Sequence, residues 1–196
     1  MSVIVDTSCA NISSLKFALE RISEDVQVSA DPAVIQSADH VFLPGVGSAG
    51  FAMEALVQKE LITTIKGLTQ PVLGICLGMQ LLMSRSAEGD TACLDIIPGE
   101  VAELDAEGLR LPHMGWNTLS DQESHPLFKG ISKEEYFYFV HSFGVETGPH
   151  TLASCEYGSS FSAAVGYKNF LGVQFHPERS GLKGSQILRN FLELQL

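Results

Sequence analysis

The segment Pro71–Gln80, with the sequence PVLGICLGMQ, constrains the fold more than any other stretch of the chain. Its apolar residues up to Ile75 predict a short buried strand, and the apolar spacing that follows predicts a helix. Between them, Gly74, Cys76 and Gly78 occupy alternate positions. This is the layout of a nucleophile elbow, G-x-S-x-G, with Cys in place of Ser.

The glycines of the elbow have a physical explanation. A residue at such a corner has a strained backbone, and side chains two positions away on either side would collide. The sulfur of Cys76 would then lie at the first turn of a helix, where the helix dipole favours a thiolate. The alternative is a core cysteine between two packing glycines, because Cys is among the most buried residue types.

Composition limits the classes of protein that this chain can belong to. Its 196 residues predict one domain over residues 1–196, and its net charge of −11 argues against a nucleic-acid surface. No apolar run approaches the length of a membrane span. The N-terminus lacks the features of a signal peptide. Without a C-x-x-C pair, the cysteines are expected to be reduced thiols of a cytoplasmic protein; they are Cys9, Cys76, Cys93 and Cys155.

The first half of the chain alternates predicted strands with predicted helices. Strands are expected at 3–5, 26–28 and 41–43, before the elbow strand. Helices are expected at Ser13–Ile22, from Asp31-Pro32, and in two pieces over Ser48–Gly67. This alternation predicts an α/β fold with an open, mostly parallel sheet flanked by helices.

The second half predicts a smaller antiparallel β portion. Glu88–Asp95 reads as a polar loop, and the short apolar stretches of Pro98–Leu119 resemble hairpin strands. Further strands are expected at Tyr136–Phe143, Thr151–Glu156, Ser162–Tyr167 and Phe170–Phe175, and a final amphipathic helix at Gly184–Leu196.

His176 and Glu178 are the candidate partners of the cysteine. His176 ends a predicted strand, and open α/β sheets place their sites at that edge, where the elbow strand also ends. A cysteine nucleophile needs a base, and the base needs a group that orients it, so His176 and Glu178 can supply both. Taken alone, His-Pro-Glu also fits an exposed strand end; together with the elbow it favours a triad.

Pro44–Gly47, with the sequence PGVG, follows another predicted strand. Its glycines leave backbone N–H groups free to face an anion, which suits an oxyanion site. The alternative is a simple Pro-Gly turn. A phosphate loop is disfavoured because no Lys-Ser/Thr pair begins the following helix.

Several motifs together resemble a known family. GICLGMQ at Gly74–Gln80, PGVG at Pro44–Gly47 and GVQFHPERS at Gly172–Ser180 resemble the class I (triad) glutamine amidotransferases, over the whole chain. Other motifs resemble more narrowly the glutaminase subunits of imidazole glycerol phosphate synthase; they are Asp6-Thr7 with Asn11, PHMGWN at Pro112–Asn117 and YFVHS at Tyr138–Ser142.

The resemblance implies roles for individual residues. Cys76 would attack the carboxamide of L-glutamine to give a γ-glutamyl thioester and ammonia, with His176 transferring protons and Glu178 orienting it. The oxyanion would be held by backbone amides near Gly45-Val46 and at Leu77. Positions that match glutamine-binding ones in the family are Gly47, Gln80, His141, Ser142 and Phe143. Phe143 stands where the family suggests Tyr, so only a main-chain contact would survive there.

The resemblance also implies a partner. Ammonia would pass to a (β/α)8 synthase subunit in a heterodimer. That subunit would join it to a phosphoribulosyl-formimino intermediate, giving imidazole glycerol phosphate and aminoimidazole carboxamide ribotide in histidine biosynthesis. The residues that the resemblance places toward the partner are His113, Trp116, Asn117 and Tyr138; the alternative for His113 and Trp116 is that they only pack a hairpin. No cofactor is implied, and the spacing of the remaining histidines predicts no metal.

Three alternatives remain open at this point. A glutaminase that feeds anthranilate or pyridoxal phosphate synthesis is disfavoured by PHMGWN and YFVHS. A free-standing cysteine hydrolase would be active without a partner. A non-enzymatic scaffold would have no need of all three of Cys76, His176 and Glu178.

Overall fold

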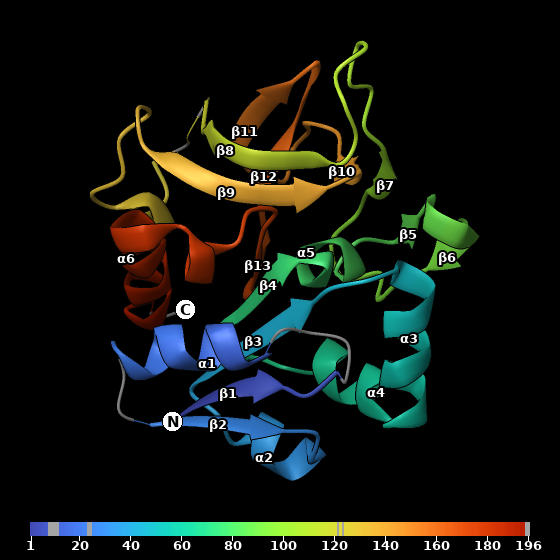
Figure 1. Cartoon of the computed structure of the whole chain (residues 1–196). Coiled ribbons are helices and arrows are strands. Elements are labelled where there is room, and N and C mark those ends of the chain that lie inside the picture. The colour runs from blue at the N-terminus through green and yellow to red at the C-terminus, as the bar shows by residue number, and fades with distance from the viewer. Residues whose placement is uncertain (8–11, 23–24, 121, 123, 195–196) are drawn as a thin grey trace.

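A seven-stranded sheet forms the centre of the computed structural model, which describes residues 1–7, 12–22, 25–120, 122 and 124–194 (Figure 1). The strands from β13 to β2 pair in parallel, and β11 and β12 continue the sheet antiparallel. Their order across the sheet is β11 (Thr151–Tyr157), β12 (Ser159–Tyr167), β13 (Phe170–Val173), β4 (Val72–Cys76), β3 (His40–Gly45), β1 (Ser2–Val5) and β2 (Val26–Ser29). The predicted fold class, an open and mostly parallel sheet with an antiparallel portion, is confirmed.

Helices cover both faces of this sheet because side chains alternate along each strand. Ile4, Phe42 and Leu73 belong to one buried cluster, which contains residues of α1 and α6. Val3 and Val41 belong to the other, with residues of α2, α3 and α4. Figure 1 shows the two sets on opposite sides. The helices are α1 (Ile12–Glu20), α2 (Pro32–Gln36), α3 (Ala49–Gln58), α4 (Leu61–Lys66), α5 (Leu77–Leu81) and α6 (Gly181–Leu192).

Local sequence signals explain where two of these helices begin. The Asp31 carboxylate accepts a hydrogen bond of 2.8 Å from the backbone N–H of Ala33, so Asp31 caps α2 as predicted. Between α3 and α4, Glu60 has a φ of 56°. This residue separates the two helical pieces that the sequence predicted.

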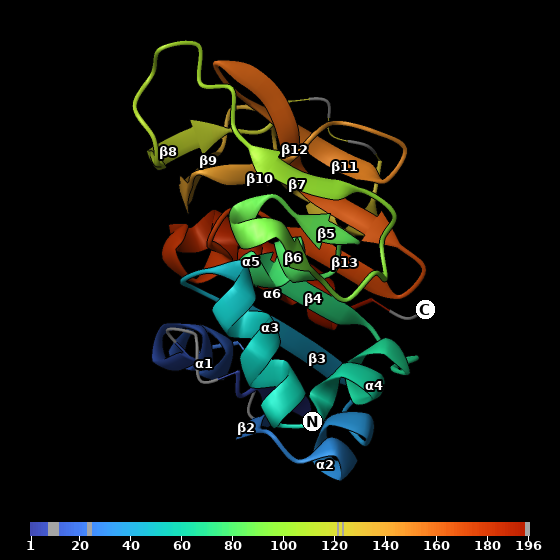
Figure 2. The same ribbon diagram turned by 90° about the vertical axis from the view of Figure 1, so that its right-hand side faces the viewer.

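Two smaller sheets, one mixed and one antiparallel, lie beside the main sheet (Figure 2). One is a four-stranded sheet in the order β10 (Phe143–Val145), β7 (Glu100–Glu103), β5 (Arg85–Ser86) and β6 (Thr91–Ala92). The other pairs β8 (His113–Thr118) with β9 (Tyr136–His141). The expectation of a hairpin within Pro98–Leu119 was therefore wrong: β7 pairs with β5 and β10, and β8 pairs with β9.

Strand β3 runs further than the sequence suggested. Pro44 pairs with Ile75 and Gly45 with Cys76, whereas the strand was expected to end at Leu43. The pairing of β3 with β1 stops at Phe42, so Pro44 has a strand neighbour on one side only. Proline is tolerated at such an edge because its missing N–H removes no ladder hydrogen bond.

The elbow is packed backbone against backbone. A Cβ added at Gly78 would lie 1.8 Å from the carbonyl oxygen of Leu43, and one added at Gly74 would lie 2.7 Å from the carbonyl oxygen of Gly78. Neither contact can relax by moving a side chain. The expected collision on either side of Cys76 is confirmed.

This packing predicts a large effect of one methyl group. Gly78→Ala should lower the free energy of unfolding by at least about 3 kcal/mol, since overpacking against rigid backbone exceeds the usual range. Gly148→Ala is the matched control, because a Cβ there meets nothing within 4 Å. Urea unfolding of both variants measures the difference, and equal stabilities would contradict the geometry.

Candidate active site

The sharp turn between β4 and α5 holds Cys76 at the carboxyl edge of the sheet. Cys76 has φ 54° and ψ −113°, a conformation that costs a non-glycine residue free energy. Its residue surface is 7% exposed, so the thiol is buried yet lies in the wall of a cavity. Such strain, held by the packing of Gly74 and Gly78, is typical of a residue whose position matters for chemistry.

His176 and Glu178 lie in the same wall. His176 Nδ1 is 2.8 Å from Glu178 Oε1, and each side chain is 7% exposed. Burial lowers the pKa of His176, but Cys76 and Glu178 outweigh it and raise the pKa to about 10. These two neighbours therefore favour the imidazolium form of the ring. Its Nε2 makes no hydrogen bond of good geometry among the described residues, although the Cys76 sulfur lies close enough to act on the ring.

The turn that carries His176 is held rigidly. The backbone N–H of His176 donates to the carbonyl of Tyr138 at 2.9 Å. The Ser180 hydroxyl donates to the His176 carbonyl at 2.7 Å and accepts from the N–H of Tyr138 at 2.9 Å. Helix α6 packs closely on this turn, since a Cβ at Gly184 would lie 1.9 Å from the carbonyl oxygen of Pro177. The base is thus fixed to β9 and α6 at once.

A cavity of about 360 Å³ opens on these three residues. Every residue that the sequence proposed for catalysis, the oxyanion or glutamine lines it; these are Gly45, Val46, Gly47, Cys76, Leu77, Gln80, His141, Ser142, Phe143, His176 and Glu178. The wall also contains residues to which the sequence assigned no role in catalysis or binding: Leu15, Pro44, Ile75, Glu88, Pro112, Val140 and Arg179. The chain folds so that seven separate segments share one cavity.

Glu88 is the most informative of the residues that sequence reasoning missed. Its Oε2 accepts a hydrogen bond of 2.8 Å from the backbone N–H of Ala49, at the start of α3. Ser48, the N-cap residue, makes no side-chain capping bond, so a carboxylate 39 residues away serves instead. Nothing in the sequence near Glu88 signals this role, because Glu88–Asp95 reads only as a polar loop; it contains a 3₁₀ turn, Glu88–Asp90, and β6.

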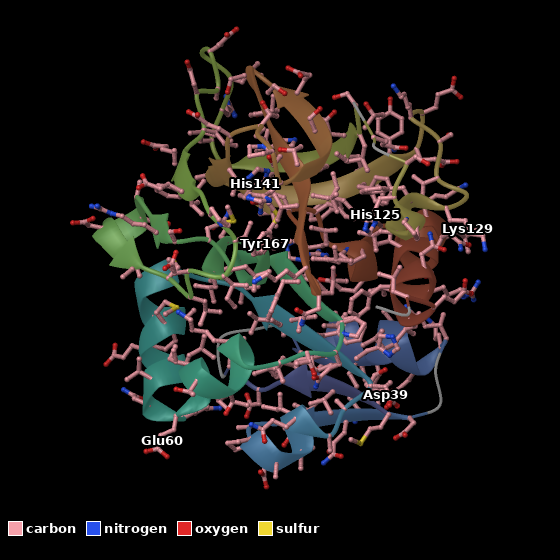
Figure 3. All side chains as sticks on the ribbon, turned by 180° about the vertical axis from the view of Figure 1, so that it is seen from behind. Asp39, Glu60, His125, Lys129, His141 and Tyr167 are labelled. Carbon is pink, nitrogen blue, oxygen red and sulfur yellow. The ribbon has the colours of Figure 1, made fainter. Side chains whose placement is uncertain are left out.

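A buried polar network forms the back of the cavity. Gln80 Nε2 donates to the main-chain carbonyl of Phe143 at 2.8 Å, and His141 Nδ1 meets the same carbonyl at 2.8 Å. His113 Nδ1 is 3.0 Å from His141 Nε2. His141 is 6% exposed, and Figure 3 draws it away from the outline of the molecule, where Lys129 lies. Phe143 makes both contacts, with Gln80 and with His141, through its main-chain carbonyl, so they do not need the phenol hydroxyl of a tyrosine.

The hairpin β8–β9 presents apolar side chains to solvent. Met114, Trp116 and Tyr136 are 62%, 55% and 58% exposed, and the rings of Trp116 and Tyr138 meet edge to face at 5.9 Å. His113 corrects the expectation that it faces a partner. It is 3% exposed and stacks on the rings of Phe139 and Tyr157; the Asn117 amide donates to the carbonyl of Glu156 at 2.9 Å.

Some sequence predictions concern other residues. Asp6, from the narrower set of motifs, pairs with Lys59 at 3.1 Å, whereas Asn11 and Cys9 lie outside the described residues. Cys76, Cys93 and Cys155 are free thiols. No group of side chains in the described part of the chain could hold a metal ion. Across the same residues, none of the helices has the length and apolar character to cross a membrane.

Comparison with known proteins decides the family. The model of the family "Glutamine amidotransferase class-I" matches residues 4–194. This chain belongs to the class I glutamine amidotransferases. Its amidotransferase fold is shared by a glutamine amidotransferase crystal structure (TM-score 0.75, 17% identity, 97% of each chain) and one from Thermotoga maritima (TM-score 0.71, 16% identity, 98% of this chain and 96% of the other).

Two relatives with a higher sequence identity to this chain bear the name of a particular enzyme subunit. A protein of Vibrio vulnificus strain YJ016, named imidazole glycerol phosphate synthase subunit HisH 1, is 56% identical over 198 residues, covering 98% of this chain and 97% of the relative. A subunit HisH from Colwellia psychrerythraea is 53% identical over 208 residues, covering 98% and 92%. The similarity spans the cavity and both halves of the amidotransferase chain.

The paired histidines predict how stability depends on pH. Burial lowers the pKa of His113 to about 4 and that of His141 to about 3. Between pH 6.5 and 4 the unfolded chain therefore binds more protons than the folded chain. The free energy of unfolding should decrease as the pH is lowered, by up to about 1.4 kcal/mol per pH unit for each histidine. Urea unfolding at a series of pH values measures this. In His113→Phe the contribution of His113 to this pH dependence should disappear. An unchanged pH dependence would contradict the lowered pKa of His113.

Proposed function

We propose that this chain is the glutaminase subunit of imidazole glycerol phosphate synthase. It hydrolyses L-glutamine to glutamate and ammonia, and the ammonia is used by a partner subunit. The observation that carries the proposal is the meeting of Cys76, His176 and Glu178 in one cavity, in a chain whose 53–56% identical relatives bear that subunit's name.

The proposed reaction begins with the Cys76 thiolate and the His176 imidazolium. The sulfur adds to the carboxamide carbon of glutamine, and the negative charge moves to the carbonyl oxygen. Backbone N–H groups near Gly45-Val46 and at Leu77, the first residue of α5, stabilise that oxygen. His176 gives its proton to the nitrogen, and the C–N bond breaks to leave a thioester and ammonia. A water that has given its proton to His176 then cleaves the thioester, releasing glutamate and regenerating the thiolate.

The rest of the cavity wall suits the amino-acid end of glutamine. The Glu88 carboxylate is the acidic side chain there that is not part of the triad, and it can attract the substrate's ammonium group. Gly47 and the main chain of 141–143 can contact its carboxylate and carbon chain. Because these residues hold the amino-acid end of glutamine, the carboxamide at its other end is directed at Cys76.

The relatives' name, a synthase subunit, indicates that this chain works in a complex. We propose that its partner is a (β/α)8 subunit and that the pair is a cytoplasmic heterodimer without a cofactor. The exposed side of β8–β9, with Trp116 and Tyr138, and the neighbouring Asn117, is the proposed contact. His113 supports this surface from inside. The complete synthase makes imidazole glycerol phosphate and aminoimidazole carboxamide ribotide for histidine synthesis, with residues 1–196 acting as one domain.

The Cys76→Ala variant tests the nucleophile. Glutamine-dependent synthesis by the complex should fall to below about a thousandth of wild type, as loss of a triad member usually does. Synthesis from added ammonium salt should persist, because it bypasses the glutaminase. Both rates are measured on the same complex. Glutamine-dependent turnover above that level would indicate another nucleophile.

Glu178→Gln and His176→Ala separate orientation from proton transfer. The amide in Glu178→Gln can still contact His176 Nδ1 but no longer stabilises the imidazolium. Its loss of kcat should therefore be roughly tenfold to a hundredfold smaller than the loss caused by His176→Ala. Steady-state glutaminase assays of the complex decide the ranking. A more damaging change at Glu178 would reverse the two roles.

A further inference from the structure

Two buried glutamine side chains lie directly behind the cysteine. Gln174 follows β13 and is 0% exposed; Gln80, on α5, is 4% exposed. Gln80 Nε2 and Gln174 Oε1 are 2.9 Å apart. A buried amide is tolerated only when its donors and acceptors find partners, so the orientation of each amide carries information.

The orientation of both amides follows from a single carbonyl group. The main-chain oxygen of Phe143 can only accept, so the group 2.8 Å away must be the NH₂ of Gln80. The second hydrogen of this NH₂ is donated to Gln174, so the side-chain oxygen of Gln174 must be the acceptor. The NH₂ of Gln174 is then turned toward Cys76, where its nitrogen is 3.6 Å from the sulfur.

The histidine pair fixes that carbonyl from the other side. His141 Nδ1 donates to the Phe143 oxygen at 2.8 Å, which leaves His141 Nε2 to accept from His113 Nδ1 at 3.0 Å. His141 must be neutral for this arrangement because its Nε2 accepts, and burial keeps the pKa of both rings well below neutrality. The Phe143 oxygen thus has two donors, and Gln80 cannot turn its amide without losing one of them.

The sulfur of Cys76 has two uncharged polar neighbours of opposite character. As a thiol it can donate to the carbonyl oxygen of Val140, 3.8 Å away. That bond is lost when the thiol ionises. The Gln174 NH₂ remains, and a donor favours the anionic form of its partner. His176 adds its positive charge to the same end.

We propose that Gln174 is a further catalytic residue, whose amide N–H donates to the Cys76 sulfur and stabilises the thiolate. The proposal rests on the glutaminase function above and deepens it. Gln174 is absent from the described residues that line the cavity, so it acts on the nucleophile and not on glutamine. Its loss should lower kcat and leave KM unchanged.

The test uses Gln174→Leu, which keeps the approximate shape and removes the donor. The rate of Cys76 alkylation by iodoacetamide is followed against pH in the whole chain, with mass spectrometry to read the Cys76 peptide. A hydrogen bond to a charged group corresponds to about tenfold to a hundredfold. The alkylation profile should therefore move upward by about one to two pH units. In the synthase complex, kcat should fall by the same factor.

Asn190→Leu is the matched control. Asn190 is equally buried, at 3% exposed, and its amide makes two hydrogen bonds of 2.8 Å, to the carbonyls of Leu127 and Lys129. Its loss should reduce stability and leave the Cys76 profile unchanged. Gln174→Glu, which keeps the side-chain length, provides a second variant if Gln174→Leu does not fold; a carboxylate beside the sulfur should move the profile further upward.

The outcomes separate the donor role of Gln174 from the proposed glutaminase function of the chain. An unmoved alkylation profile in a folded Gln174 variant overturns the donor role, whatever the glutaminase rate. Equal shifts in Gln174→Leu and Asn190→Leu would also overturn it, by showing a general effect of destabilisation. A shift specific to Gln174 supports the donor role even if wild-type complex fails to use glutamine, and that failure would count against the proposed function alone.

Discussion

The contact between Gly78 and the carbonyl of Leu43 is the constraint on which the site depends. It presses the start of α5 against the end of β3 without an intervening side chain. Gly45 continues this contact, since a Cβ there would lie 2.9 Å from the backbone nitrogen of Gly78 and 3.0 Å from Leu77 Cβ. The same packing that strains Cys76 therefore brings the PGVG segment beside Cys76, so the proposed nucleophile and the proposed oxyanion donors are positioned together.

Burial has opposite consequences for the histidines near the cavity. His176, His141 and His113 all lose solvent, which disfavours the imidazolium in each. His176 has a sulfur and the carboxylate of Glu178 as neighbours, and these outweigh the loss. The other two face each other and apolar rings, so they stay neutral. One is suited to hold a proton for the reaction, and the pair is suited to hold fixed hydrogen bonds.

The sequence predicted those parts of the site that depend on one short segment. The elbow around Cys76 and the His-Pro-Glu turn are local patterns with their own physical reasons, and strand order then brings them together. The role of Glu88 could not be predicted, and for His113 the sequence could not decide between packing and a partner contact, because each depends on contacts between distant segments: Glu88 with Ala49, and His113 with Tyr157. The partners of β7 and β8 escaped prediction for the same reason, since short apolar stretches do not encode which strand they will meet.

Strand β9 contacts both the segment that carries Cys76 and the segment that carries His176. One edge of it pairs with β8, and the N–H and C=O of Tyr138 point to the other edge, where they bind Ser180 and His176. Carbonyls two residues apart in a strand point the same way, so Val140 faces Cys76. An open strand edge exposes unpaired backbone groups, which proteins must cover. Here the segments that carry Cys76 and His176 cover it, so the hydrogen bonds that close the sheet edge also hold the proposed nucleophile and the proposed base at a fixed separation.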